Sequence, residues 1–199
     1  MKAYIIISAI LFSIALNAQN KEPEFIGEVN LIKCDSTLLL DKEYLKTNTS
    51  ADASLLLFGI GSARTKIEVT GRYAHVRIDN NQSFHLIAKS IDNNSDPMSV
   101  VRIFQFAVYH DTRKAEIASS DVYGGISNGK LRNVSYKASK YGNSSYDISF
   151  TSLPTGEYGV MVFNPNNRDS HAILIYCFGV GHPKKHRGWV KYGSDGVYY

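Results

Sequence analysis

The sequence predicts an all-β fold, a single Greek-key, immunoglobulin-like β-sandwich of about ten strands. Apolar and polar residues alternate with the period of a strand over much of the chain, and Gly, Asn, Asp and Pro interrupt the alternation at roughly ten-residue intervals. No segment sustains a helical period over three turns. The nearest candidate, 42–57, contains the polar run 47–50, which disfavours a single long helix.

Individual strands follow from the same patterns. Segments 66–70, 74–79 and 145–150 alternate apolar with polar residues, as a strand does when one face contacts a core and the other faces water. Segments 100–109 and 172–180 are apolar at nearly every position, which is typical of central strands buried on both faces. We therefore expect two packed sheets with these two segments near the middle.

Length and composition support one domain and exclude several classes of protein. The chain has 199 residues, of which 44% are hydrophobic, so it can bury a core and is not a disordered chain. Its formal net charge of +4 is too mild to indicate a nucleic-acid partner. Two cysteines are too few for a four-cysteine zinc site. We expect no resident cofactor apart from the calcium candidate described below.

The first 18 residues have the parts of a secretory signal peptide. Lys2 supplies the positive charge, 4–16 is the apolar stretch, and Ala18 is the small residue before the expected cleavage. The alternative is a membrane anchor, but the run is shorter than the ~20 residues that span a bilayer, and no second apolar run follows it. The sequence thus predicts an exported domain over 19–199, periplasmic, outer-membrane-associated or extracellular, with no membrane span after cleavage.

A six-residue motif points to a particular device of β-sandwiches. Leu153, Gly156 and Tyr158 form the pattern Leu-x-x-Gly-x-Tyr before an apolar strand. This pattern is similar to a tyrosine corner, in which the Tyr hydroxyl bonds a nearby backbone group and fixes a crossover between the sheets. The alternative is an ordinary turn followed by a strand.

Several short motifs together carry a resemblance. They are Ala18-Gln19, Phe25-Ile26-Gly27-Glu28, Asp96-Pro97-Met98, Tyr141-Gly142 and Leu-Pro-x-Gly-Glu-Tyr at 153–158. With them, the chain resembles a group of secreted proteins of Bacteroides-type bacteria, over most of the residues after the signal peptide. The resemblance implies export and a β fold. The group has no activity that could be transferred to this chain.

The two cysteines are candidates for a disulfide. Cys34 lies near the end of an expected N-terminal strand and Cys177 lies inside the last strong strand. An exported compartment permits the bond, and first and last strands are often neighbours. The alternative is a pair of buried thiols that behave as small hydrophobic residues.

Two further segments are candidate ligand sites. Asp92, Asn94 and Asp96 alternate as oxygen ligands of Ca²⁺ do, although Pro97 stands where a calcium loop needs Gly and a solvated hairpin loop is the alternative. The C-terminal segment combines cations with aromatic rings, which suit anionic glycans; the alternative is a last hairpin whose aromatics cover a sheet edge. Its candidate residues are Lys184, Lys185, Arg187, Trp189 and Tyr192.

No catalytic residue can be named from the sequence. His110-Asp111 lacks a nucleophile motif, and no carboxylate stands in a motif that pairs it with another. We therefore predict a non-catalytic binding or envelope-interaction module with a glycan or protein ligand. Two alternatives stay open, namely a secreted hydrolase with carboxylates in a loop-built cleft and a structural subunit of the envelope that exchanges a strand.

Overall fold

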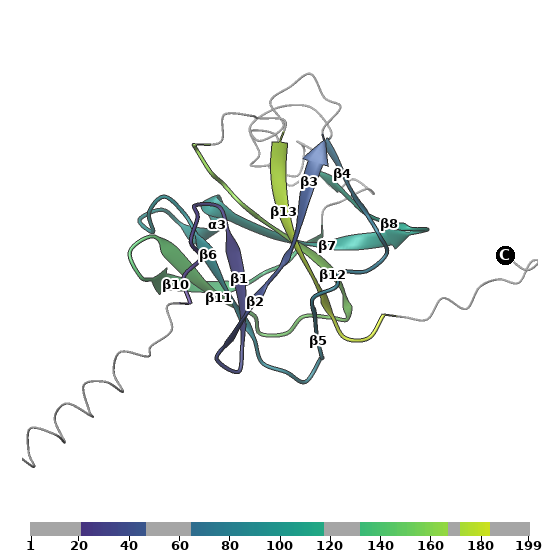
Figure 1. Cartoon of the computed structure of the whole chain (residues 1–199), viewed down its shortest axis with the longest axis horizontal. Coiled ribbons are helices and arrows are strands. Elements are labelled where there is room, and N and C mark those ends of the chain that lie inside the picture. Colours follow the sequence, from purple (N-terminus) through teal and green to yellow (C-terminus); the bar gives the residue numbers. More distant parts are fainter. Residues whose placement is uncertain (1–20, 47–64, 118–131, 167–171, 184–199) are drawn as a thin grey trace, which may run out of the picture.

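The computed structural model describes residues 21–46, 65–117, 132–166 and 172–183 (Figure 1). These residues form thirteen strands in two sheets and one short helix, so the expected all-β sandwich is confirmed. The elements are β1 (Val29–Lys33), β2 (Ser36–Leu39), β3 (Asp41–Lys46), β4 (Thr65–Thr70), β5 (Arg77–Ile78), β6 (His85–Lys89), α3 (Pro97–Val100), β7 (Val101–Tyr109), β8 (Thr112–Ile117), β9 (Arg132–Asn133), β10 (Lys137–Tyr141), β11 (Ser145–Ser149), β12 (Gly156–Val162) and β13 (Ala172–Val180).

Two of these strands contain only two residues each. β5 covers only the last part of the segment 74–79, where the alternation predicted a longer strand. β9 is too short for any alternation to be visible in the sequence. The Greek-key connectivity stays a prediction. Within the described residues, no helix has the length and apolarity needed to cross a membrane.

The first sheet has the strand order β10-β11-β6-β1-β2, and all its pairs are antiparallel. It includes the segment at 145–150 whose alternation predicted a half-buried strand. Tyr146 and Ile148 of β11 are buried against the second sheet, while Asp147 lies on the opposite face. Part of that outer face is covered, because the Lys89 ammonium donates to the carbonyl of Pro23 and the Asn30 amide donates to that of Lys21.

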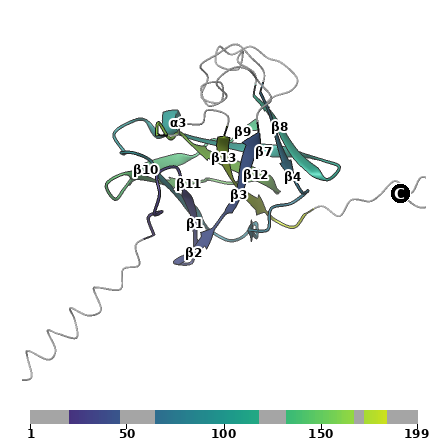
Figure 2. The same cartoon turned by 45° about the horizontal axis from the view of Figure 1, so that its top comes forward.

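The second sheet has the order β3-β13-β12-β7-β8-β4. β5 pairs with the end of β13 in parallel, and β9 pairs with the middle of β7. The two segments expected to be central, β7 and β13, each have neighbours on both sides. Figure 2 shows β10 and β11 on one side of the molecule and β4 and β8 on the other.

Both faces of the second sheet are buried, which explains its long apolar runs. In β13, Tyr176 and Phe178 face the core between the two sheets, whereas Ile175 and Cys177 face a second core on the other side. The second core is completed by residues of β4 and β8, including Ile67. A strand with apolar neighbours on both faces has no polar positions to alternate.

The tyrosine corner motif makes the hydrogen bond expected of it. The Tyr158 hydroxyl donates to the carbonyl of Pro154, four residues upstream, at 2.5 Å. The ring is buried and stacks on Phe178 with centroids 5.3 Å apart. Burial raises the pKa of Tyr158 to about 12, because the phenolate would lose its hydration.

The expected disulfide between Cys34 and Cys177 is wrong, since both cysteines are free thiols. Cys34 lies in the exposed turn between β1 and β2, where it and Asp35 have positive φ angles. Cys177 is buried in the second core, and its strand pairs with β3 and β12 rather than β1. The first and last strands thus lie in different sheets. Burial raises the pKa of the Cys177 thiol to about 12, which keeps it protonated.

Candidate functional site

The described residues form a hollow of about 350 Å³ at one end of the second sheet, which we call the arginine pocket. Its lining includes three arginines, Arg72, Arg77 and Arg132, and a single carboxylate, that of Glu157. The arginines come from the segment after β4, from β5 and from β9, while Glu157 comes from β12. Four segments that are distant in the sequence therefore meet at this pocket.

The segment that carries Arg72 is held at both ends. β4 ends at Thr70, and Gly71 then adopts a φ of 88°, a left-handed conformation that favours glycine. The Gly71 N–H donates to the Asp111 carbonyl at 2.8 Å, and the buried Arg113 side chain donates from Nε to the Gly71 carbonyl at 3.0 Å. Two residues beyond Arg72, the Ala74 N–H donates to Glu157 Oε2 at 2.7 Å. Residues 72 and 73 are thereby fixed against the sheet.

An ion pair crosses the sheet at the base of the pocket. Arg77 Nη1 and Glu157 Oε1 are 2.5 Å apart, and their side chains are 21% and 3% exposed. The backbone register explains how they meet, because Gly179 of β13 pairs with Glu157 on one side and with Arg77 on the other. A Cβ on Gly179 would collide with the Arg77 guanidinium. Glycine at this position therefore lets Arg77 reach across the intervening strand.

Both side chains of the ion pair also form further hydrogen bonds within the protein. Arg77 donates through Nε and Nη2 to the carbonyl of Gly181, and Glu157 accepts from both Arg77 and Ala74. Such a pair, deep in the protein and hydrogen-bonded at both ends, is a rigid structural unit. Glu157 is already occupied and does not neutralise the other two arginines.

The remaining arginines give the pocket a surplus of positive charge. Arg72 and Arg77 both place their guanidinium groups over the Tyr73 ring, at 5.6 and 5.8 Å from its centroid, in cation–π contacts. Arg72 Nε is buried and has no hydrogen-bond partner among the described residues. Arg132 is exposed at the rim. A planar guanidinium matches the geometry of a carboxylate, sulfate or phosphate, so this arrangement suits an anionic group.

A second hollow of about 360 Å³, which we call the polar hollow, adjoins the arginine pocket. The two share Gln105 and Arg132 in their linings. Gln105 lies over Gly156, where a Cβ would collide with its amide. The remaining lining is rich in hydroxyl and amide groups and contains no further charge; it consists of Asn133, Val134, Ser135, Thr151, Ser152, Leu153, Pro154 and Tyr158.

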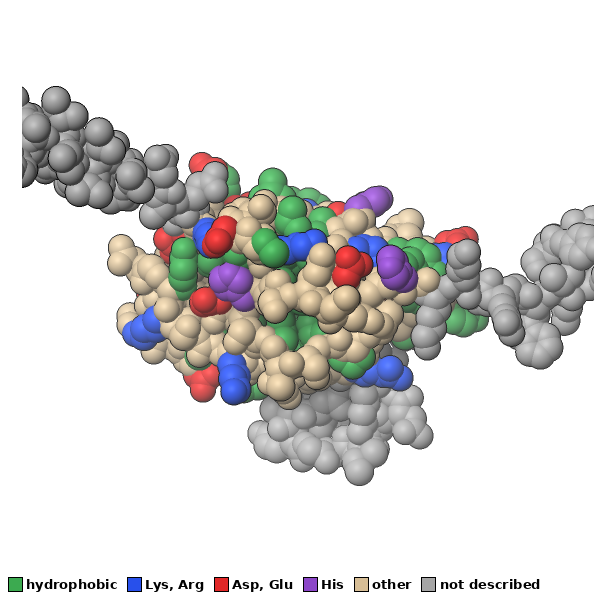
Figure 3. Space-filling view, turned by 90° about the horizontal axis from the view of Figure 1, so that it is seen from below, with side chains coloured by type: hydrophobic (Ala, Val, Ile, Leu, Met, Phe, Trp, Pro, Cys, Tyr) green, Lys and Arg blue, Asp and Glu red, His purple; other side chains and the backbone are tan. Residues whose placement is uncertain are grey.

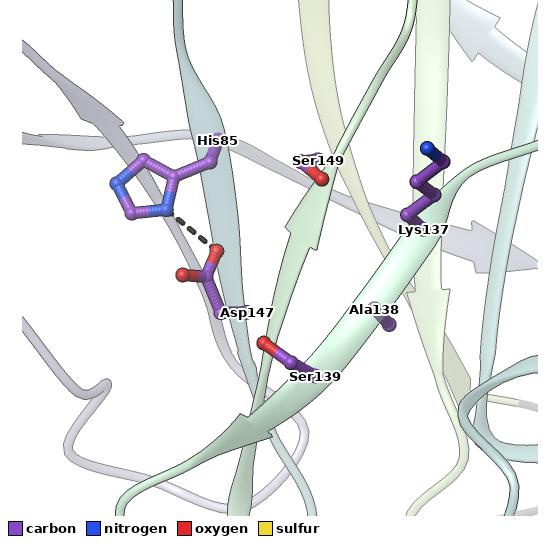
Figure 4. A pocket seen from close by; sticks show the side chains of 6 residues that line it. All are labelled: His85, Lys137, Ala138, Ser139, Asp147 and Ser149. Atoms are coloured by element: carbon purple, nitrogen blue, oxygen red, sulfur yellow. Dashed lines mark hydrogen bonds and ion pairs between the residues drawn. The ribbon is translucent and has the colours of Figure 1, made fainter.

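A third hollow, of about 270 Å³, lies on the outer face of the first sheet (Figure 4). His85 Nδ1 and Asp147 Oδ1 are 2.6 Å apart, and Ser139 and Ser149 lie beside them. The combination of His, Asp and Ser invites comparison with a hydrolase triad. Figure 4 shows the second imidazole nitrogen turned away from both hydroxyls, so a nucleophile, a base and an orienting acid are not aligned here.

The three residues of the candidate calcium loop contact other groups of the protein, and the calcium site stays a prediction. Asp96 accepts from the Met98 N–H as the N-cap of α3, and Asp92 accepts from the Asn94 N–H. Asn94 Oδ1 accepts from the Lys140 ammonium at 3.1 Å, so a cation of the chain itself occupies that oxygen. Within the described residues, no group of three or more His, Cys, Asp or Glu side chains is placed to hold a metal ion.

Other contacts show what this loop does instead. The Asn93 amide donates to the carbonyls of Gly142 and Ser145 in the β10–β11 hairpin, and the Tyr146 hydroxyl donates to the Ser95 carbonyl at 2.8 Å. The alternating polar residues thus close a structural turn over the end of the first sheet. Local backbone capping competes for the same oxygens that a metal would need.

The basic and aromatic C-terminal candidates, Lys184 to Tyr192, lie outside the described residues, as does the signal segment 1–18. The sequence reasoning missed the arginine pocket. One signal could have indicated it: Glu157 stands inside an apolar strand directly after the tyrosine corner glycine, where a carboxylate needs a cationic partner. The sequence does not say which cation that is.

Comparison with known proteins adds no relative. No family model, no curated protein and no solved structure matches the chain. The function must therefore be argued from the site itself.

Proposed function

We propose that this protein is an exported, non-catalytic binding module that takes an anionic ligand in the arginine pocket. The observation that carries the proposal is the surplus of guanidinium groups at one hollow. Glu157 is committed to Arg77 and Ala74, while Arg72 lines the hollow and Arg132 stands at its rim. An anionic ligand would neutralise this surplus through charge-assisted hydrogen bonds.

The chemistry of the lining favours binding over catalysis. General acid–base hydrolysis of a glycoside uses two carboxyl groups that face the same bond. The lining of the arginine pocket holds one carboxylate, and that one is locked into an ion pair. The signal segment at 1–18 and the resemblance to secreted proteins support export, which would bring the pocket to acidic glycans or other polyanions of the envelope and surroundings.

The presence of cations does not by itself indicate a ligand site, because cations occur elsewhere on the protein. Figure 3 shows one face on which blue and red side chains are scattered among polar atoms rather than gathered by sign. The arginine pocket differs in that three cations converge on one hollow, where Arg72 and Arg77 lie over the Tyr73 ring and Arg77 is also hydrogen-bonded to the Gly181 carbonyl. Convergence of a few polar groups in a concave site is the usual mark of a ligand pocket.

Isothermal titration of residues 19–199 with polygalacturonate, and with neutral dextran, tests this proposal. We expect the polyanion to bind and dextran not to bind. Arg132→Gln should weaken polyanion binding by about tenfold, since one charge-assisted contact is worth about 1.5 kcal/mol or more. The matched control is Lys137→Gln, which removes one charge from the hollow beside His85. Absence of polyanion binding, or an equal loss in both variants, would overturn the proposal.

A further inference from the structure

We infer that the ligand is an acidic oligosaccharide that places its anionic group in the arginine pocket and continues through neutral sugar hydroxyls into the polar hollow. The inference rests on the proposed function and extends it to the class of ligand. Its basis is the shared lining of the two hollows, since Gln105 and Arg132 contact both. A ligand bound at Arg132 is therefore at the entrance of the polar hollow.

The walls of the polar hollow match a polyhydroxylated molecule. Ser135, Thr151 and Ser152 carry hydroxyl groups, and Gln105 and Asn133 carry amides, so the hollow offers both donors and acceptors. Arg132, at the boundary, is its only charged lining residue among those described. Sugar hydroxyls also donate and accept, so such a chain can satisfy groups of both kinds.

The polar hollow also has apolar lining residues. Val134, Leu153 and Pro154 supply apolar surface, while Tyr158 lies buried below them with its hydroxyl bonded to the Pro154 carbonyl. This combination offers a small apolar contact for the C–H face of a sugar ring beside groups for its hydroxyls. An acidic peptide of similar length would present apolar side chains to the hydroxyl and amide groups and leave them unpaired.

The arrangement of the two hollows predicts which part of the ligand is charged and which part is neutral. Positive charge is confined to one end of the continuous lining, at Arg72, Arg77 and Arg132, and uncharged polar groups occupy the other end. A single acidic sugar would engage the first end alone. A longer chain engages both, so its affinity should rise with length until the polar hollow is filled and should not rise further.

Calorimetry with galactose oligomers of one to four sugars, in which only the terminal sugar is acidic, tests this inference on residues 19–199. The acidic sugar is a galacturonate in one series and a sulfated galactose in the other, so the two series separate carboxylate from sulfate as the source of the charge, and binding of either supports the inference. We expect the dissociation constant to fall by about tenfold or more between one sugar and three, equivalent to about 1.4 kcal/mol. A peptide of three residues, one glutamate and two apolar residues, should bind more weakly than the three-sugar chain.

Two variants assign the effect to the two hollows. The double variant Asn133→Ala, Ser152→Ala removes polar groups from exposed positions of the polar hollow, and it should weaken the three-sugar chain by about tenfold while leaving the single acidic sugar within about twofold. Arg132→Gln should weaken the binding of the three-sugar chain and of the single acidic sugar alike. Thermal midpoints of the variants check that each remains folded.

The outcomes separate the inference from the function on which it rests. If no anion binds in any form, the proposed function fails. If anions bind but the length of the sugar chain and the double variant have no effect, the function stands and the inference is overturned. Equal or tighter binding of the peptide with one glutamate would likewise overturn the inference and identify an acidic peptide as the ligand.

Discussion

The arginine pocket and the hollow beside His85 both contain a carboxylate close to a nitrogen-bearing side chain, yet they differ in what surrounds that pair. The side chains of His85 and Asp147 are each about one-third exposed, at 31% and 33%, so water can replace either partner. Glu157 is almost wholly buried, and Arg77 lies beside two further arginines. Of these two hollows, only the arginine pocket combines a cation held by hydrogen bonds, Arg77, with guanidinium groups that its carboxylate does not neutralise, those of Arg72 and Arg132.

The backbone shows how this difference arises. Asp147 and His85 lie on adjacent strands, on a face that the pleat turns outward, and neither reaches across a neighbour. Arg77 and Glu157 lie on strands that flank β13 and meet over the glycine of that strand. The first arrangement needs only strand alternation, whereas the second needs one glycine at one register position. The following predictions test that contrast.

Removal of the buried carboxylate should have the largest effect. Glu157→Gln leaves the Arg77 charge without its partner, and breaking a buried pair in this way costs about 3 kcal/mol or more of unfolding free energy. Urea denaturation measures the loss. Glu68→Gln is the matched control, because Glu68 pairs with Lys114 at the exposed surface and should cost less than about 1 kcal/mol. Similar losses in the two variants would mean that Glu157 is not a structural anchor.

A methyl group on the crossing glycine should have the next largest effect. Gly179→Ala would force the Arg77 guanidinium aside, at a cost of about 2 kcal/mol, as for other overpacked sites. The specific test is a double-mutant cycle with Arg77→Ala, measured by urea denaturation. The cost of Gly179→Ala should fall by at least about 1 kcal/mol once Arg77 is gone. Additive effects would show that the two residues do not interact.

The tyrosine corner, which begins the strand that carries Glu157, should show a smaller effect that depends on pH. Tyr158→Phe removes a buried hydrogen bond and should cost about 1 to 2 kcal/mol at pH 7. Because the pKa of Tyr158 is raised to about 12, the unfolded chain ionises first as pH rises above about 10, and the wild type loses stability between those two values.

Denaturation curves between pH 8 and pH 11.5 measure this loss. The Phe variant should lose less stability over that range than the wild type, because its ring cannot ionise. Tyr109→Phe, at an exposed tyrosine, is the control and should follow the wild type. Parallel pH profiles for wild type and Tyr158→Phe would contradict the assignment of the buried hydroxyl.

The smallest effect on stability should come from the exposed pair formed by His85 and Asp147. Asp147→Asn should change the unfolding free energy by less than about 1 kcal/mol, as for other solvent-exposed pairs, and should leave polygalacturonate binding unchanged. Thermal unfolding and calorimetry measure the two quantities. Loss of polygalacturonate binding in this variant would indicate that the ligand site lies on the first sheet and not in the arginine pocket.

The fold was predictable from the sequence because its signals are local. Alternation at 145–150 corresponds to β11, and the continuous apolar runs correspond to β7 and β13 at the centre of the second sheet. β9 was not predictable, because two residues carry no period, and β5 is shorter than the alternation at 74–79 predicted. The disulfide failed for a related reason: the position of a cysteine along the chain does not say in which sheet its strand lies.

The candidate site was not predictable, because it exists only through pairing between distant strands. Arg77 and Glu157 are 80 positions apart, and Gly179 between them has no local feature that marks it as a crossing point. The calcium hypothesis rests on a local signal instead. Asp92 and Asp96 have a suggestive spacing, and the structure adds that backbone N–H groups of the same turn donate to their oxygens.

Mapping of backbone amide shifts by NMR during titration with a three-sugar galactose chain that ends in one galacturonate tests the central claim most directly. The account predicts shifts at 72–77, 105–107, 132–135 and 151–157, which carry the two adjoining hollows, and none at 85, 137–139 and 147–149. Shifts confined to the segments around His85 and Asp147, or no shifts at all, would contradict it.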